Sequence, residues 1–381
     1  MKKTKSNANS GFYDYSLLAV IVLLICFGLI MLYSTSAYTA EIEFNDDMHY
    51  FRRQSIISAG SIVIAIFVSR ADYHILKKYV EPLYIFALGL MLLVKTPLGV
   101  ESNGARRWLK FGPFQFQPAE VAKIAVIVTM SMIIVHIGRE IQEKRYFFIL
   151  MMAGGIQAAA AYLFTDNLST AIIIFGICFG MLFVARKDYK VFVGIVGSGL
   201  VLAVVGISYL YATMSQSSSF RLTRILVWLR PEQYADTQGY QTLQALYAIG
   251  SGGLMGRGLG NSIQKLGSVP EAQNDMIFSI ICEELGIFGG VAVLLLFGYL
   301  LYRLFLIAQN APDLFGTLLV SGIFIHMALQ VVLNVAVVLN WLPNTGVTLP
   351  FISYGGTSIV FLMGEMGLAL SVARQIRFED E

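Results

Sequence analysis

The residue best placed to do chemistry is Asp275, which follows a glycine-rich basic loop and precedes a long apolar segment, in GSGGLMGRGLGNSIQKLGSVPEAQNDMIFSIICEELG. Pro270 suits the first turn of a helix, and Glu271 and Asp275 would then lie where the helix dipole favours negative charge. A carboxylate at this place can act as a general base. It can equally cap the helix or pair with a cation, and the residues alone leave both interpretations open.

Four polar residues lie inside apolar segments, where ionisable or amide side chains need a partner or a function. Glu283 and Glu284 follow Asp275 on the same segment, about 12 Å along a helix axis. We expect them to pair with Lys123 or to line a cavity. Lys123 should either extend outward or pair with Glu120. The fourth residue is Asn334.

Two segments are rich in basic side chains. Arg107 and Lys110 flank Trp108 in the first, and Arg257 and Lys265 belong to the glycine-rich loop. Glycine lets backbone amides approach an anion, but the loop has neither a Gly-Lys-Ser/Thr ending nor a complete G-x-G-x-x-G pattern. Both segments are candidates for phosphate binding. The alternatives are an anchor for lipid headgroups in the first segment and a flexible hinge in the second.

Composition identifies a membrane protein. The 381 residues are 56% hydrophobic and 13% charged, whereas a soluble domain is roughly 25% charged. A net charge of +3 gives no support to a nucleic-acid partner. The three cysteines fall in apolar runs, and the four histidines lack metal-binding spacing, so we predict neither disulfides nor a preformed metal site.

Apolar windows of roughly 20 residues predict about ten transmembrane helices in an all-α, single polytopic domain of residues 1–381. The windows lie near residues 15–37, 54–70, 80–98, 118–137, 146–164, 168–185, 190–212, 272–302, 314–339 and 350–373. Lys and Arg collect in alternate short loops, which predicts that both termini are cytoplasmic. Residues 213–271 then form a long extracytoplasmic loop, and Asp275 faces the exterior.

Three further features concern the connections between spans. Apolar spacing predicts helices lying in the membrane surface at residues 220–229 and 243–250. Asp166, in a tight connection, is expected to cap the sixth span. Prolines and glycines between residues 343 and 356 predict broken backbone that re-enters the membrane and must line protein or water.

Several motifs together resemble the SEDS family (shape, elongation, division and sporulation), whose members include FtsW, RodA and SpoVE. The resemblance runs along the whole chain and favours the FtsW and SpoVE branch. It rests on GARRWLKFGPFQFQPAEVAK, GYQTLQALYAIGSGGLMGRGLGNSIQK, VPEAQNDMIFSIICEELG and LPNTGVTLPFISYGGTS.

The resemblance implies a peptidoglycan glycosyltransferase of the bacterial plasma membrane that polymerises lipid II during septal cell-wall synthesis and cell division. It implies a class B penicillin-binding protein transpeptidase and other divisome membrane proteins as partners. Asp275 matches the family's catalytic aspartate. The substrate-binding candidates are Arg107, Trp108, Lys110, Glu120, Lys123, Arg257, Lys265, Glu283, Glu284 and Asn334. No cofactor is required by the sequence, and a divalent cation, Mg²⁺ or Mn²⁺, is a possible helper.

The chain departs from the family pattern at three places. Gln273 stands where His is expected, Asn340 where Gly is expected, and TDNLST replaces a Pro-Asp-x-Gly-Thr sequence. Gln273 argues against an obligatory imidazole, and the roles of Asp166 and Asn340 stay open. Two rival functions also remain: a flippase for the lipid-linked precursor, and a scaffold that only recruits the transpeptidase.

Overall fold

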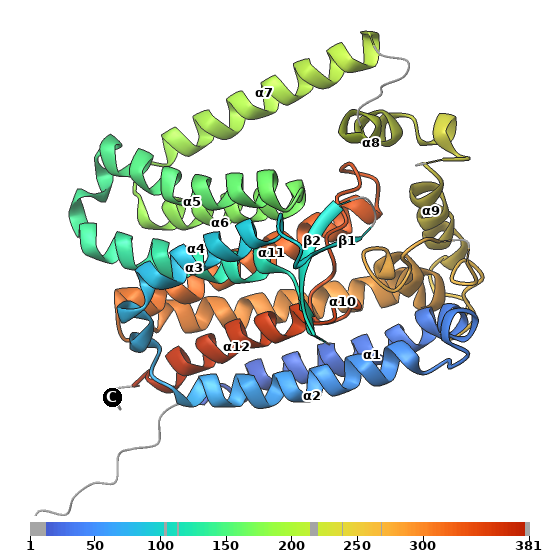
Figure 1. The fold of residues 1–381 in the computed structure, drawn as a ribbon, viewed down its shortest axis with the longest axis horizontal. Coiled ribbons are helices and arrows are strands. Elements are labelled where there is room, and N and C mark those ends of the chain that lie inside the picture. The colour runs from blue at the N-terminus through green and yellow to red at the C-terminus, as the bar shows by residue number, and fades with distance from the viewer. Residues whose placement is uncertain are drawn as a thin grey trace, which may run out of the picture.

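The computed structural model describes residues 13–102, 105–112, 114–213, 220–237, 239–267 and 269–377. Long apolar helices make up most of it (Figure 1). They are α1 (Tyr15–Phe44), α2 (His49–Arg70), α3 (Val80–Leu93), α4 (Pro118–Ile137), α5 (Lys144–Phe164), α6 (Leu168–Ala185), α7 (Tyr189–Thr213), α10 (Ile277–Gln309), α11 (Leu314–Val338) and α12 (Ser358–Arg374). Two short helices, α8 (Phe220–Leu229) and α9 (Tyr240–Gly252), lie between α7 and α10.

These helices confirm a multi-pass membrane fold. Within the described residues, eight helices are long and apolar enough to cross a membrane. Helices α3, with 14 residues, and α12, with 17 residues, occupy the other two predicted positions. Helices α8 and α9 agree with the two short helices that apolar spacing predicts.

The loops predicted to be cytoplasmic meet at one end of the bundle. Arg303 near the end of α10 pairs with Asp14 at 2.7 Å, and Lys77 pairs with Asp313 at 3.1 Å. Gln375 after α12 donates a hydrogen bond to Asp72. Figure 1 shows the sheet, α8 and α9 at the opposite end. The alternation of basic loops therefore agrees with the course of the chain.

A small antiparallel sheet makes the all-α prediction incomplete. Strands β1 (Gly99–Ser102), β2 (Ala105–Phe111) and β3 (Phe114–Phe116) pair in the order β1-β2-β3 between α3 and α4. Aromatic and alternating residues in this segment favour strand, a signal that the search for spans does not use. Leu109 of β2 packs with Leu90 of α3 and with Val94 directly after it, which fixes the sheet on the bundle.

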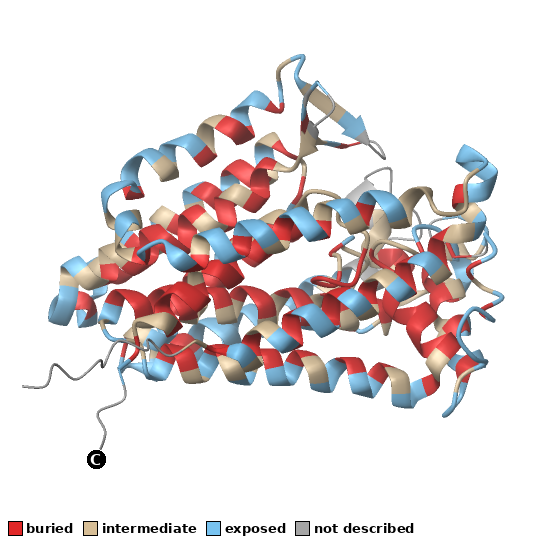
Figure 2. Ribbon diagram, turned by 90° about the horizontal axis from the view of Figure 1, so that it is seen from below, coloured by how far each residue is buried: buried red, intermediate tan, exposed pale blue. Residues whose placement is uncertain are grey.

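The core of the bundle is apolar side chains shared by most of the long helices. Figure 2 shows the buried residues where helices face each other and the exposed residues on the outer faces, as expected where lipid replaces water. Helix α7 is the exception, because only 6% of its most apolar stretch is buried. Its buried Phe192 packs edge-on against Phe147 and Phe179, and so joins α7 to α5 and α6.

Candidate active site

Asp275 precedes the helix rather than opening it. The first helical residue of α10 is Ile277, and the residues from Pro270 to Met276 form turns, so the prediction that Pro270 begins the helix is wrong. Glu271 has a positive φ of 55°, which is incompatible with a right-handed helical turn. Asn334 of α11 holds the backbone of Asp275 instead, by donating to its carbonyl oxygen at 2.8 Å.

The Asp275 carboxylate is buried but has few partners. Its residue is 8% exposed, and Gln241 of α9 donates a long hydrogen bond to Oδ1 at 3.4 Å. Burial, reinforced by the negative charge of Glu271, raises the pKa of Asp275 to about 7, and Arg224 acts in the opposite direction. A carboxylate with a pKa near the working pH is suited to accept a proton.

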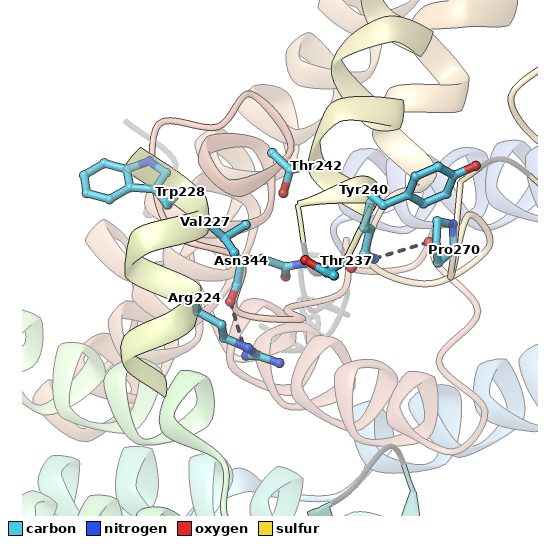
Figure 3. Close-up of a pocket in the computed structure, with 9 residues that line it drawn as sticks. Arg224, Val227, Trp228, Thr237, Tyr240, Thr242, Pro270 and Asn344 are labelled. Carbon is cyan, nitrogen blue, oxygen red and sulfur yellow. Dashed lines mark hydrogen bonds between the residues drawn. The ribbon is translucent and has the colours of Figure 1, made fainter. Parts of the chain in front are cut away.

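A cavity of about 260 Å³ is connected to this carboxylate through Gln241, which lines the cavity, whereas Asp275 itself does not. Side chains from α8, α9 and three connecting segments surround it, as Figure 3 shows: Arg224, Val227, Trp228, Thr237, Tyr240, Gln241, Thr242, Pro270 and Asn344. Gln241 joins the cavity to Asp275, because its amide nitrogen donates to Pro270 O at 3.2 Å and also to the carboxylate. The wall of the cavity is therefore mixed, with an arginine and amides beside apolar groups.

Arg107 and Arg224, from distant segments of the chain, lie close enough near Asp275 for the charge of Arg107 to lower the pKa of Arg224. Burial, together with the positive charge of Arg107, lowers the pKa of Arg224, and Asp275 opposes this shift. Burial also lowers the pKa of Arg107. Arg224 donates to Asn344 O at 3.2 Å, and the Nε atom of Arg107 is buried without a hydrogen-bond partner among the described residues. Both guanidinium groups remain cationic and are suited to bind an oxyanion.

Strand β2 divides the basic cluster around Trp108. The pairing of β1 with β2 is irregular here, because Val100 pairs with Trp108 and Glu101 with Arg106, which leaves Arg107 as an extra residue of β2. Simple alternation holds for the regular residues that follow, where Leu109 is buried and Lys110 lies on the opposite, outer face. Arg106 and Lys110 are exposed, whereas Arg107 and Trp108 are partly buried. Exposure thus separates Lys110 from Arg107, which reaches Asp166 O at 3.4 Å.

Asp166 does not cap α6, contrary to expectation. The side chain of Asn167 accepts the hydrogen bond from Thr170 N and is the cap. Asp166 has a left-handed φ of 47°, pairs with Lys95 at 3.0 Å, and accepts a hydrogen bond from Arg107 at its carbonyl oxygen. Asp166 thus supports the position of Arg107.

Asn340 also has a left-handed backbone, with φ 57°. Glycine is favoured in this conformation and asparagine is the commonest replacement, so the expected glycine and the observed residue meet the same need. Its carbonyl oxygen accepts a hydrogen bond from Trp228 Nε1 at 3.0 Å. Trp228 therefore fastens α8 to the end of α11.

The glycine-rich loop forms backbone hydrogen bonds with α10 at a break in that helix. Gly286 has φ 72°, which interrupts the helix and leaves backbone groups without their usual partners. Arg257 N donates to Glu283 O at 2.9 Å, and Ile287 N donates to Gly253 O at 2.9 Å. A Cβ on Gly256 would lie 2.2 Å from Glu284 O, so the close approach requires glycine. The loop amides that contact α10 are occupied, which disfavours the interpretation of this loop as an anion cradle.

Glu283 and Glu284 are fully buried at this break and have many partners. Glu284 pairs with Lys265 at 2.8 Å and accepts hydrogen bonds from Ser34 of α1. Glu283 accepts hydrogen bonds from Ser262 and from Ile263 N, and Arg257 approaches it to 3.8 Å. The expected pairing of these glutamates with Lys123 is wrong, because residues of the long loop pair with them instead.

Lys123 pairs with Glu120 at 2.8 Å, which confirms one of the two expected arrangements. Both residues are buried near the start of α4, which begins at Pro118 as predicted. Of the predicted substrate-binding residues, Arg107 and Asn334 lie in the surroundings of Asp275. The described contacts of Arg257, Lys265, Glu283 and Glu284 belong to the helix break.

Sequence reasoning missed three residues around Asp275, namely Arg224, Gln241 and Asn344. Arg224 was interpreted only as the polar flank of a surface helix, because the apolar stripe of residues 220–229 accounts for its spacing. A signal was available, because Arg224 lies off that apolar stripe. It also belongs to the long loop, which is predicted to lie on the same side of the membrane as Asp275. Gln241 and Asn344 join each other at 2.9 Å across the cavity, a contact that no local pattern reveals.

Comparison with known proteins places the chain among cell cycle proteins. The family model for FtsW, RodA and SpoVE, described as "Cell cycle protein", matches residues 15–378. Stage V sporulation protein E of Bacillus subtilis (strain 168) is 36% identical over 369 residues, 96% of this chain and 98% of that protein. The probable peptidoglycan glycosyltransferase FtsW of Geobacter sp. (strain M18) has the same identity and coverage.

Solved structures share the fold. A chain from a study entitled "Structural coordination of polymerization and crosslinking by a peptidoglycan synthase complex" matches with a TM-score of 0.77 and 27% identity, over 95% of this chain and 98% of that one. The rod shape determining protein RodA of Thermus thermophilus matches with a TM-score of 0.68 and 27% identity, over 99% of this chain and all of that one.

Proposed function

Because the chain belongs to the FtsW, RodA and SpoVE family, we propose that it is a peptidoglycan glycosyltransferase that polymerises lipid II during septal cell-wall synthesis. Relatives of this length bear the name probable peptidoglycan glycosyltransferase FtsW, and the match covers nearly the whole chain. The observation in the structure that carries the proposal is Asp275, a buried carboxylate with a pKa of about 7 that Gln241 connects to a cavity lined in part by Arg224.

The reaction requires a base on one side and cations on the other. The 4-hydroxyl of the acceptor sugar attacks the anomeric carbon of the donor, and its proton passes to Asp275. The bond from that carbon to the pyrophosphate oxygen breaks, and its electron pair leaves on undecaprenyl pyrophosphate. Since the donor linkage of lipid II is α and that of the polymer is β, a single displacement with inversion accounts for the product.

Arg107 and Arg224 are the proposed cations for the departing pyrophosphate. Guanidinium groups bind phosphate oxygens through paired, charge-assisted hydrogen bonds, which strengthen as negative charge develops. Trp108 belongs to the same strand as Arg107, and Lys110 on the outer face is assigned a weaker role at the headgroup surface. Glu120 and Lys123 retain a proposed substrate-side role as a buried, preformed pair at the start of α4.

A divalent cation is proposed as an accessory that arrives with the substrate. Among the described residues, no three His, Cys, Asp or Glu side chains gather in a way that would hold a metal ion. Pyrophosphate oxygens would then supply most of its ligands, with the carboxylates of Asp275 and Glu271 closest to the site. Bound there, Mg²⁺ or Mn²⁺ would neutralise charge on the leaving group.

The partner and the orientation in the membrane are part of the proposal. The solved complex with the similar fold is titled for both polymerization and crosslinking, which supports a penicillin-binding protein transpeptidase of class B as partner, with further divisome membrane proteins around it. We place the protein in the bacterial plasma membrane with Asp275 outside and both termini inside. Cysteine labelling in intact cells checks this: Gln233→Cys should react from outside, and Lys187→Cys only after permeabilisation.

A flippase is disfavoured by the contacts of the intramembrane polar residues. Lys123, Glu283, Glu284 and Asn334 would have to line a passage, yet each is buried against protein partners. Polymerisation of labelled lipid II by the purified protein with its transpeptidase, in detergent, separates the hypotheses, because no membrane is crossed there. Polymer formation is expected. Its absence with a folded complex would leave the flippase and the scaffold.

A further inference from the structure

Helix α11 carries a line of buried polar side chains that the polymerisation chemistry does not use. His326, Gln330 and Asn334 are spaced four residues apart, so they lie on one face and are separated by about 6 Å along the axis. Their exposed fractions are 0%, 5% and 1%. Polar groups at this depth of a membrane protein need partners or a function.

Each of the three side chains uses one polar atom to bond protein. Asn334 Nδ2 donates to Asp275 O at 2.8 Å and to Val347 O at 2.7 Å. Gln330 Nε2 donates to the next loop carbonyl, Thr348 O, at 3.1 Å. Their amides thus satisfy consecutive carbonyls of the broken backbone after α11, and Asn334 ties that backbone to Asp275.

The inner end of the line is an ionisable pair. His326 Nδ1 lies 2.8 Å from Glu365 Oε2 of α12, and both residues are almost completely buried. This pair is remote in sequence from every residue of the proposed reaction. Its contact with α12 fixes the ring orientation of His326, so the second ring nitrogen points away from Glu365.

Each side chain also has one buried polar atom without a hydrogen-bond partner among the described residues. These atoms are His326 Nε2, Gln330 Oε1 and Asn334 Oδ1. Three such atoms on one helix face, each one turn from the next, are unusual, because buried polar groups nearly always bond protein or ordered water. The helix rises about 6 Å over four residues, a spacing that one water molecule with two hydrogen bonds of about 2.8 Å each can bridge.

We infer that this face of α11 is a binding site for a file of internal waters, which runs from the His326–Glu365 pair to Asn334 and positions Asp275. The waters bridge His326 to Gln330 and Gln330 to Asn334. By fixing the amide of Asn334, they fix the carbonyl of Asp275 and hence the direction of its carboxylate. Asn334 and Gln330 are positioning residues, and this second part rests on the proposed function of Asp275.

Electron cryomicroscopy of the full chain bound to its transpeptidase, at a resolution that shows ordered water, tests the file without any turnover. We expect density within hydrogen-bonding distance of both Gln330 Oε1 and Asn334 Oδ1, and between His326 Nε2 and Gln330 Oε1. A map in which these atoms bond each other or neighbouring side chains, with no water density, overturns the inference. This result is independent of whether Asp275 is catalytic.

The substitution Gln330→Met tests the positioning role, because Met has similar volume and no comparable hydrogen-bonding groups. We expect loss of the adjacent water density, a displaced Asp275, and a kcat about tenfold to a hundredfold lower with an unchanged KM for lipid II. Val332→Met, on the exposed face of the same helix, is the control and should match the wild type. If Gln330→Met removes the waters and leaves both Asp275 and kcat unchanged, the positioning role is wrong.

Discussion

The carboxylate of Asp275 and the carboxylates at the break in α10 differ in the partners that surround them. At the break, Glu284 has a lysine at 2.8 Å and a serine hydroxyl at 2.7 Å. Within the described part of the chain, the side-chain hydrogen bond to the Asp275 carboxylate is a long one from Gln241 at 3.4 Å, beside a bond from its own backbone, and a second carboxylate, Glu271, lies close enough to raise its pKa. Both sites are buried, so burial does not distinguish them. The two sites differ in the number and the charge of the groups that contact the carboxylates.

This difference separates structural from chemical carboxylates. A carboxylate that already has a close cation and several donors, as Glu284 does, has its hydrogen-bonding capacity filled by the protein. A buried carboxylate with few donors and a like charge nearby gains from taking a proton, which is what a general base must do. On this comparison we propose that Glu283 and Glu284 maintain α10 and that Asp275 takes part in the reaction.

The largest expected effect is the loss of activity in Asp275→Asn. Asn keeps the size of the side chain but cannot accept the proton, so the polymerisation rate should fall by roughly two to four powers of ten. Gel analysis of labelled lipid II products measures this, and thermal unfolding in detergent should show an intact fold. Glu232→Gln, an exposed acid of the same loop, is the matched control. Near wild-type polymerisation by Asp275→Asn would place the base elsewhere.

Glu284→Gln should have the opposite profile. It leaves Lys265 buried without its anion, and breaking such a pair typically costs about 3 to 5 kcal/mol of folding free energy. Unfolding in detergent should therefore occur at a clearly lower temperature, while the protein that remains folded still polymerises lipid II. Adding Lys265→Met should restore much of the lost stability, because the double variant no longer buries an ammonium group without an anion. A stable but inactive Glu284→Gln variant would move Glu284 to the reaction.

Arg107 and Arg106 provide a comparison within one strand. Arg107→Ala should lower kcat/KM for lipid II by a factor that corresponds to about 1.5 to 3 kcal/mol of activation free energy. This is the range of a charge-assisted hydrogen bond. Arg106→Ala should have almost no effect, because Arg106 is exposed and its ion pair with Glu101 is long, at 3.7 Å. Initial rates at limiting lipid II measure kcat/KM for both variants and show whether they differ. Equal losses would mean that the sheet acts as a general basic surface.

The membrane fold could be predicted from the sequence because hydrophobic length is a local property. Each predicted span contains a long helix or, at α3 and α12, a shorter one, and Pro118 marks the start of α4 as expected. The break at Gly286 could not be predicted in this way, because its cause is a loop far back in the chain that pairs with the helix backbone. The sheet was missed for a different reason, since its alternation is short and lies between two much stronger signals.

The candidate site was predictable only in part. Asp275 and Arg107 stand out by type and position, but the proximity of Arg224 to both depends on how α8 folds back over the bundle. The pairing of Lys265 with Glu284 could not be predicted, because a charged residue in a sequence looks the same whether it binds substrate or another side chain. Only the contacts distinguish these cases.

The pH dependence of the single-turnover polymerisation rate tests the central claim most directly. The rate should rise with pH with an apparent pKa near 7, because Asp275 acts only when deprotonated and burial and Glu271 raise its pKa. In Glu271→Gln the negative neighbour is gone, so the pKa of Asp275 falls and the rise should move to lower pH; Glu232→Gln should leave it in place. A rise near pH 4 in the wild type, or one that Glu271→Gln does not move, would contradict the assignment of Asp275 as the buried base.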